Sequence, residues 1–252
     1  MKKILIAGMT LAGTMGIFAQ GSLVFNNFAS GTPEAAGVNV VFHVYSPQVA
    51  TPGVEVTGNS SVAYSTSARN GDFPTGTQTY TGTLLGGSTV GTGATAWANG
   101  NNYSADLVAA AGDNAPVSSL TLVTGSVTTF RTTSASVAGW FTAPAIGALS
   151  IPGTTYSGSG ITTLPTSASC AVQAWYNGGG TIPTYAVAVA DGLPAGQGAE
   201  FNVDGLGGGT VNPPNLYNGQ SFSLTTVPEP GTIALGVMGL GAFLARRRML
   251  KK

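Results

Sequence analysis

Apolar and polar residues alternate along many short segments of this chain. In the segment 38–45, one face of an extended chain would carry Val38, Val40, Phe42 and Val44. A period of two residues is typical of β-strands that are buried on one side. Similar patterns or β-rich runs predict further strands at residues 22–28, 103–109, 119–123, 127–132, 136–141, 168–176, 185–190, 199–203 and 221–225.

Turn-forming clusters such as Asn177 to Gly180 and Gly205 to Gly209 separate these segments. Many short strands without helices between them predict an all-β fold, and we expect an antiparallel β-sandwich of the jelly-roll type. Residues 107–111 could instead be helical, because alanine favours helices. Residues 57–100 are poorer in large apolar side chains, so we expect weakly paired strands and long loops there.

The N-terminus has the pattern of a secretory signal peptide. The basic residues Lys2 and Lys3 precede an apolar stretch at residues 4–18, which we expect to form the signal helix. Cleavage is predicted between Ala19 and Gln20.

The C-terminus has a second apolar stretch, residues 232–245, followed by Arg246, Arg247 and Arg248. Fourteen residues are short for a membrane span, which needs about 20, but arginine side chains can extend the apolar length by reaching outward. We expect a transmembrane helix here, and a soluble core helix is the alternative.

Basic residues flank both apolar stretches on their outer ends, and such clusters stay in the cytoplasm. The residues between the two stretches are therefore predicted to lie across the inner membrane. The expected organisation is a signal peptide at residues 1–19, a secreted β-sandwich ectodomain at 20–226 and a C-terminal signal at 227–252.

Charge is scarce in the predicted ectodomain. Residues 20–226 contain only two basic residues, Arg69 and Arg131, against eight acids, so their net charge is −6. Binding to nucleic acid requires lysine and arginine to neutralise phosphates, and this composition argues against that class of partner.

The residues that usually carry chemistry are few. His43 is the only histidine and no Gly-x-Ser-x-Gly motif is present, so we expect His43 to have a packing or surface role. One histidine and one cysteine do not suggest a zinc site, and no metal or cofactor is predicted. A Ca²⁺ site built from the scattered turn acids stays open as an alternative.

Cys170 lies in a strand pattern and is expected to be buried and inert. Trp140 and Trp175 also lie in predicted strands and are expected in the core. Trp97 lies in a loop rich in Gly and Asn, which makes it the candidate glycan contact.

The end of the chain resembles a known sorting signal. Val227-Pro228-Glu229-Pro230-Gly231, the apolar stretch and the arginine triplet together resemble the PEP-CTERM signal of Gram-negative bacteria. That resemblance implies an exosortase in the inner membrane as partner, with Pro228, Glu229, Pro230, Arg246, Arg247 and Arg248 as the sorting residues.

The ectodomain has a weaker likeness of its own. Residues 20–28, 102–108, 171–175 and 219–224 resemble segments of PEP-CTERM proteins from Verrucomicrobia-like bacteria. The resemblance implies a shared β-domain and destination, and it brings no established activity.

These observations predict an exported, non-enzymatic structural protein of the cell surface or extracellular matrix. It would be anchored in the inner membrane with a periplasmic ectodomain until the exosortase releases it. The alternative is a carbohydrate-binding module or weak glycan hydrolase that acts on exopolysaccharide, for which exposed clustered aromatics or two facing acids would be the sign.

Overall fold

The computed structural model describes residues 20–30, 39–65, 67 and 69–226 of the 252-residue chain. The predicted signal helix and the predicted C-terminal transmembrane helix lie outside the described residues. Within the described part, no helix has the length and apolar character that a membrane crossing requires.

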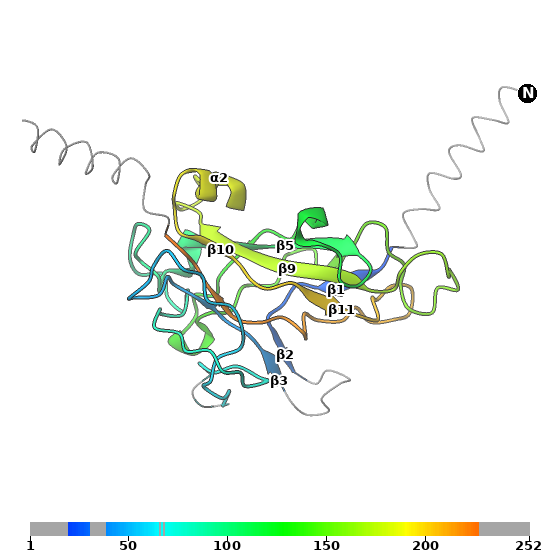
Figure 1. The fold of residues 1–252 in the computed structure, drawn as a ribbon, viewed down its shortest axis with the longest axis horizontal. Coiled ribbons are helices and arrows are strands. Elements are labelled where there is room, and N and C mark those ends of the chain that lie inside the picture. The colour runs from blue at the N-terminus through cyan, green and yellow to red at the C-terminus, as the bar shows by residue number, and fades with distance from the viewer. Residues whose placement is uncertain (1–19, 31–38, 66, 68, 227–252) are drawn as a thin grey trace, which may run out of the picture.

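The central element is a long antiparallel strand pair. β5 (Tyr103–Ala111) and β9 (Ala168–Tyr176) pair over their whole length, from Tyr103 opposite Tyr176 to Ala111 opposite Ala168. Four short strands complete this sheet: β10 (Ala195–Gln197) and β11 (Phe201–Val203) pair with β9, and β6 (Thr121–Leu122) and β7 (Thr128–Thr129) pair with β5. Figure 1 shows β5 and β9 running side by side across the molecule.

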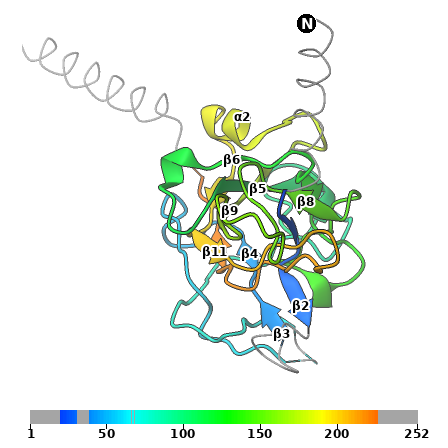
Figure 2. The ribbon, with the colours of Figure 1, turned by 90° about the vertical axis from the view of Figure 1, so that its right-hand side faces the viewer.

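Three two-stranded sheets accompany the central sheet. They pair β1 (Ser22–Val24) with β8 (Ala148–Ser150), β2 (Phe28–Ser30) with β3 (Asn39–Val41), and β4 (Val44–Tyr45) with β12 (Phe222–Ser223). Figures 1 and 2 both place β2 and β3 at the end of the molecule far from the helix α2. The predicted all-β class is confirmed, whereas the sandwich arrangement stays a prediction. The β4–β12 pair is parallel, which departs from the antiparallel expectation.

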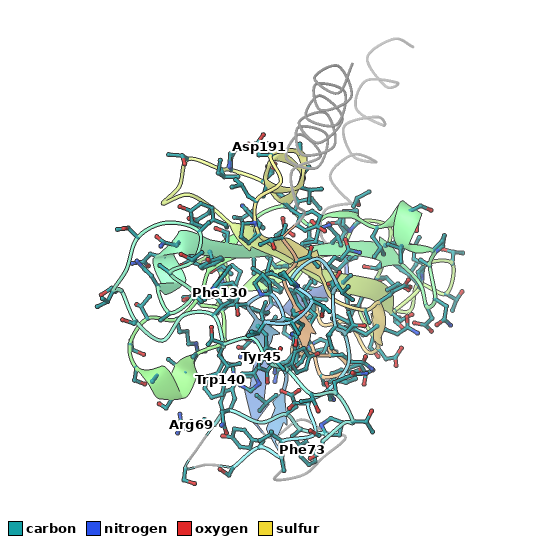
Figure 3. All side chains as sticks on the ribbon, turned by 60° about the vertical axis from the view of Figure 1, so that its left-hand side comes forward. Tyr45, Arg69, Phe73, Phe130, Trp140 and Asp191 are labelled. Carbon is teal, nitrogen blue, oxygen red and sulfur yellow. The ribbon has the colours of Figure 1, made fainter. Side chains whose placement is uncertain are left out.

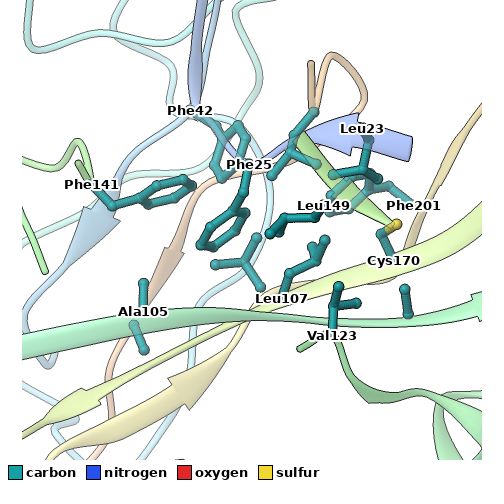
Figure 4. Close-up of a cluster of buried hydrophobic side chains, with 14 of the residues drawn as sticks. Leu23, Phe25, Phe42, Ala105, Leu107, Val123, Phe141, Leu149, Cys170 and Phe201 are labelled. Atoms are coloured by element: carbon teal, nitrogen blue, oxygen red, sulfur yellow. The ribbon is translucent and has the colours of Figure 1, made fainter. Parts of the chain in front are cut away.

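The main core lies on one face of the central sheet. Ala105 and Leu107 of β5 and Cys170 of β9 point into it, and aromatic rings cover them from the other side (Figure 4). The rings of Phe25 and Phe141 are stacked with centroids 4.3 Å apart. Small side chains on the strands leave room for these rings, which fill the core at the close packing typical of protein interiors.

The strongest strand patterns were predicted correctly. The segments 103–109 and 168–176 form β5 and β9, and residues 107–111 are strand, so the helical alternative is wrong. Residues 57–100 contain isolated bridges and a 3₁₀ helix at their end, η1 (Gly100–Asn102), which matches the expected loops. The remaining 3₁₀ helices of the described chain are η2 (Val117–Ser119) and η3 (Ala135–Val137).

Two strand predictions are wrong. Residues 185–190 form the helix α2 (Tyr185–Ala190), because the Thr184 side chain caps its N-terminus by accepting a bond from Val187 N, and Gly192 adopts a positive φ of 67° just after it. Residues 136–141 begin inside η3, and only Phe141 makes a bridge, to Phe130. The strands β8 and β10 were not predicted.

The prediction that Cys170 is buried is confirmed, since its side chain has no solvent exposure. Burial, with a smaller contribution from the charge of Glu200, raises the pKa of its thiol to about 12. The thiol is therefore protonated and unreactive at neutral pH.

We expect Cys170→Ser to lower the free energy of unfolding by about 1–3 kcal/mol, because the serine hydroxyl enters an apolar site. Urea denaturation monitored by tryptophan fluorescence measures this cost. The control is Cys170→Ala, which removes the sulfur without adding a polar group and should cost less than the serine. Rapid labelling of the native protein by a thiol reagent would contradict the buried position.

Candidate functional site

His43 follows β3 and lies in the interior with no solvent exposure. Its Nδ1 is 2.7 Å from Oδ1 of Asp72, and its Nε2 is 2.9 Å from the indole nitrogen of Trp140. An indole N–H can only donate, so Nε2 accepts this bond in the neutral ring. The proton of the neutral imidazole is then on Nδ1, which donates to the carboxylate of Asp72.

Other groups complete this cluster. The backbone N–H of Ser60 donates to the second carboxylate oxygen of Asp72. The guanidinium groups of Arg131 and Arg69 lie 5.6 Å and 6.0 Å from the ring of Trp140. Figure 3 shows Arg69 and Trp140 in the half of the molecule opposite Asp191, which follows α2. Both ring nitrogens of His43 have protein partners, and of the two expected positions, packing or surface, the structure shows the buried one. The ring connects a strand end to two loops.

Two acids elsewhere have a buried carboxylate oxygen without a hydrogen-bond partner. Asp106 of β5 is only 3% exposed, and its Oδ1 has no hydrogen-bond partner. Glu55 likewise has an unpaired buried oxygen, Oε1. Burial raises the pKa of each carboxyl to about 7, and a backbone hydrogen bond from Gln197 partly opposes the shift at Glu55.

The acids of the described chain do not gather into a metal site. Within the described ranges, no group of three or more histidine, cysteine or acidic side chains is placed to hold a metal ion. The turn acids considered for a Ca²⁺ site therefore do not form such a group among these residues.

Trp97 is half-buried and packs against the main core, although its loop position suggested exposure, while Trp140 and Trp175 are buried with 1% and 0% exposure. The Trp97 ring is half-buried and packs on Tyr103, with centroids 5.7 Å apart. It lines a surface depression of about 370 Å³ together with Pro47, Gln48 and several threonines. We call this depression the Trp97 groove.

Gln48 has an unusual position in the Trp97 groove. Its side chain is only 4% exposed, and its Oε1 accepts bonds of 2.9 Å from both the backbone N–H and the hydroxyl of Thr81. Its amide nitrogen Nε2 has no hydrogen-bond partner. An unpaired buried donor costs free energy, because its hydration is lost without a replacement hydrogen bond.

The described chain ends at the edge of the same groove. Thr226 lines the groove, and its N–H donates to the carbonyl oxygen of Pro52 at 2.8 Å. One residue earlier, Thr225 exchanges two backbone hydrogen bonds with Ala195 of β10. The body of the protein is therefore firmly attached to the chain immediately before the C-terminal signal.

A family model, described as the PEP-CTERM protein-sorting motif, matches residues 226–248. The chain carries a PEP-CTERM sorting motif. The match includes the predicted sorting residues Pro228, Glu229, Pro230, Arg246, Arg247 and Arg248, which lie outside the described residues. The motif indicates an exported protein that an exosortase sorts. No curated protein and no solved structure matches the chain.

Sequence reasoning missed Gln48 as a site residue. Its partner Thr81 lies 33 residues further along the chain, in a region without regular strands, and no local pattern predicts that contact. The buried state of Asp106 could have been suspected, because the residue falls in the middle of a strand that is otherwise apolar.

The raised pKa of Asp106 gives a prediction with a defined sign. Between about pH 4 and pH 7 the carboxyl of Asp106 keeps its proton in the folded state. In the unfolded state its pKa has the ordinary value of about 4, so the same carboxyl is ionised over this range. The contribution of Asp106 to stability is therefore fully present below pH 4 and is lost as the pH rises to about 7.

We expect Asp106→Asn to raise the free energy of unfolding at pH 8, because the variant has no carboxyl group to ionise. The gain should be about 1.4 kcal/mol for each unit by which burial raises the pKa of Asp106. The variant should also flatten the fall in stability between pH 4 and pH 8. Urea unfolding across this range measures both effects, and Asp204→Asn, at an exposed acid, is the matched control. Equal pH profiles for Asp106→Asn and the wild type would contradict the prediction.

Proposed function

We propose that the mature chain is a structural protein of the cell surface or extracellular matrix, without catalytic activity of its own. The observation that carries the proposal is the PEP-CTERM motif, which follows the folded body directly. The motif follows a β-rich body in which the single histidine is buried and hydrogen-bonded to Asp72 and Trp140.

The chemistry of the body supports a role in uncharged contacts. Residues 20–226 contain no lysine, and both arginines lie near the ring of Trp140. Apart from exposed acids such as Asp204, the surface then offers hydroxyl and amide groups and scattered exposed aliphatic side chains such as Val49 and Ile146. Many weak contacts of this kind can retain a protein in a matrix through multivalency.

The proposal includes a transient anchor. The apolar stretch 232–245 would hold the exported body at the inner membrane, with Arg246 to Arg248 on the cytoplasmic side. Exosortase processing near Pro228 to Pro230 would then release the body to the surface.

We expect the replacement of Arg246, Arg247 and Arg248 by glutamate to disturb membrane retention and C-terminal processing, because the positive stop is removed. Cell fractionation with mass measurement of the C-terminus follows both properties. Replacement of the same residues by lysine, which preserves the charge, is the matched control. Unchanged retention and processing in the glutamate variant would overturn the sorting role of the triplet.

We also expect self-association or matrix retention that changes little with salt, because few ion pairs are available to be screened. Sedimentation of the full chain in a zwitterionic, sugar-free detergent at low and high salt, with and without exopolysaccharide of the producing cells, tests this. A monomer that ignores the polysaccharide at both salt concentrations would rule out the matrix role.

The second candidate is a carbohydrate-binding module or weak glycan hydrolase. The Trp97 groove favours the binding half of this alternative, since an aromatic ring and a buried amide donor meet there. A glycan-binding body and a structural matrix role are compatible.

A further inference from the structure

We propose that the Trp97 groove binds a neutral glycan chain, with the amide nitrogen of Gln48 as hydrogen-bond donor and the indole of Trp97 as the apolar contact surface. The proposal rests on the proposed matrix function and names the ligand class and the residues that would serve it.

The first support is the fixed orientation of the Gln48 amide. Its Oε1 accepts two bonds from Thr81, and the Thr81 hydroxyl in turn accepts the N–H of Val49 at 3.1 Å. The hydroxyl proton of Thr81 is therefore directed to Gln48, and a rotation of the amide would break both contacts. This fixed orientation leaves Nε2 as a buried donor without a protein partner, and in the proposed complex an oxygen of the glycan completes its hydrogen bonding.

The second support is the rigid mounting of Trp97. Its ring rests on Tyr103 of β5, and the Tyr103 hydroxyl donates to the carbonyl oxygen of Ala94 in the same loop at 2.7 Å. A held aromatic ring next to a few placed polar groups is the usual composition of a small-molecule site. Sugar rings suit it, because they offer C–H faces to the indole and oxygen acceptors to Gln48.

The third support is the absence of charge from the walls. All described side chains that line the groove are uncharged, among them Pro47, Thr81 and Thr95. The body as a whole carries a net charge of −6 and would repel an anionic chain. The groove therefore fits a neutral glycan, and its binding should not depend on salt.

A second depression next to the groove favours a chain of sugars over a single sugar unit as the ligand. This depression of about 250 Å³ is lined by Tyr45 and Tyr80, whose rings are stacked at 4.0 Å, and it shares Gly82 with the Trp97 groove. A longer glycan can occupy both depressions, and its affinity should rise with its length.

The test uses the full chain in a zwitterionic, sugar-free detergent on an array of neutral and anionic glycans, followed by calorimetry with the neutral hexasaccharides that bind. The variants are Gln48→Glu, which keeps an oxygen for Thr81 but removes the N–H donors, and Trp97→Ala. Val117→Ala, at an exposed aliphatic residue of η2, is the control. Thermal unfolding confirms that each variant is folded.

We expect binding of at least one neutral hexasaccharide, a weaker affinity for the matching disaccharide, and the same affinity in low and high salt. Gln48→Glu and Trp97→Ala should each weaken binding about tenfold or more, whereas Val117→Ala should not change it.

The proposal is overturned if no neutral glycan binds, if only anionic glycans bind, or if folded Gln48→Glu and Trp97→Ala bind as the wild type does. Such a failure leaves the export and sorting results untouched. A loss of sorting with intact glycan binding would instead count against the proposed destination.

Discussion

The pairing of β5 with β9 is the interaction on which the rest of this structure depends. Nine residues of each strand pair without interruption, so the two faces of the ladder have strictly alternating side chains. One face presents small residues such as Ala105 and Ala174 to the aromatic core. The other face places Asp106 opposite Gln173, whose amide donates to Gln197 of β10 at 2.7 Å. The same register therefore builds the core and, behind it, a row of polar side chains in which Asp106 is buried and the two glutamines are half-buried.

Neutral hydrogen bonds hold the loops to this ladder, because the body has few charges to use. Asn27 donates to the carbonyl oxygens of Phe42 and Gly139 and accepts the N–H of Phe141. The hydroxyl of Tyr80 bonds the carbonyl oxygens of Gly58 and Ser221. Such bonds are little affected by salt, and buried polar groups that are fully paired define a single arrangement of the loops. The unpaired amide nitrogen of Gln48 is notable against this background.

The central strands could be predicted from the sequence because the pattern that indicates each strand lies within its own short segment. The segments around Leu107 and Val172 are long, apolar and bounded by turn residues. Local reading failed at residues 185–190, where the alternation of Ala and Val imitates a strand but the Thr184 cap and the residues after it form a helix. It also failed for the parallel β4–β12 pair, which joins Val44 to Phe222 across most of the chain. Contacts of this range leave no periodic signal.

The candidate site likewise has one residue that a local sequence pattern indicates and one that depends on long-range contacts. Trp97 could be proposed from its loop setting alone, since a large aromatic among glycines and asparagines has little local reason to be buried. Gln48 could not, because its role follows from two bonds to Thr81 that exist only after the loops have packed. A site residue can be predicted from the sequence when its type and the kind of segment around it are sufficient to indicate its role. A residue whose role depends on long-range packing cannot.

The position of the groove connects the two functional parts of the chain. Thr226 forms part of its wall, and Pro228 follows only two residues later. Two residues of extended chain span at most about 7 Å, so an enzyme that reads the Pro-Glu-Pro segment must work beside the groove. Under the proposed sorting, the exosortase would approach the side of the body on which the proposed glycan groove lies. The proposed order, with sorting first and matrix contact second, is compatible with this position of the groove, because the segment to be sorted begins at its wall.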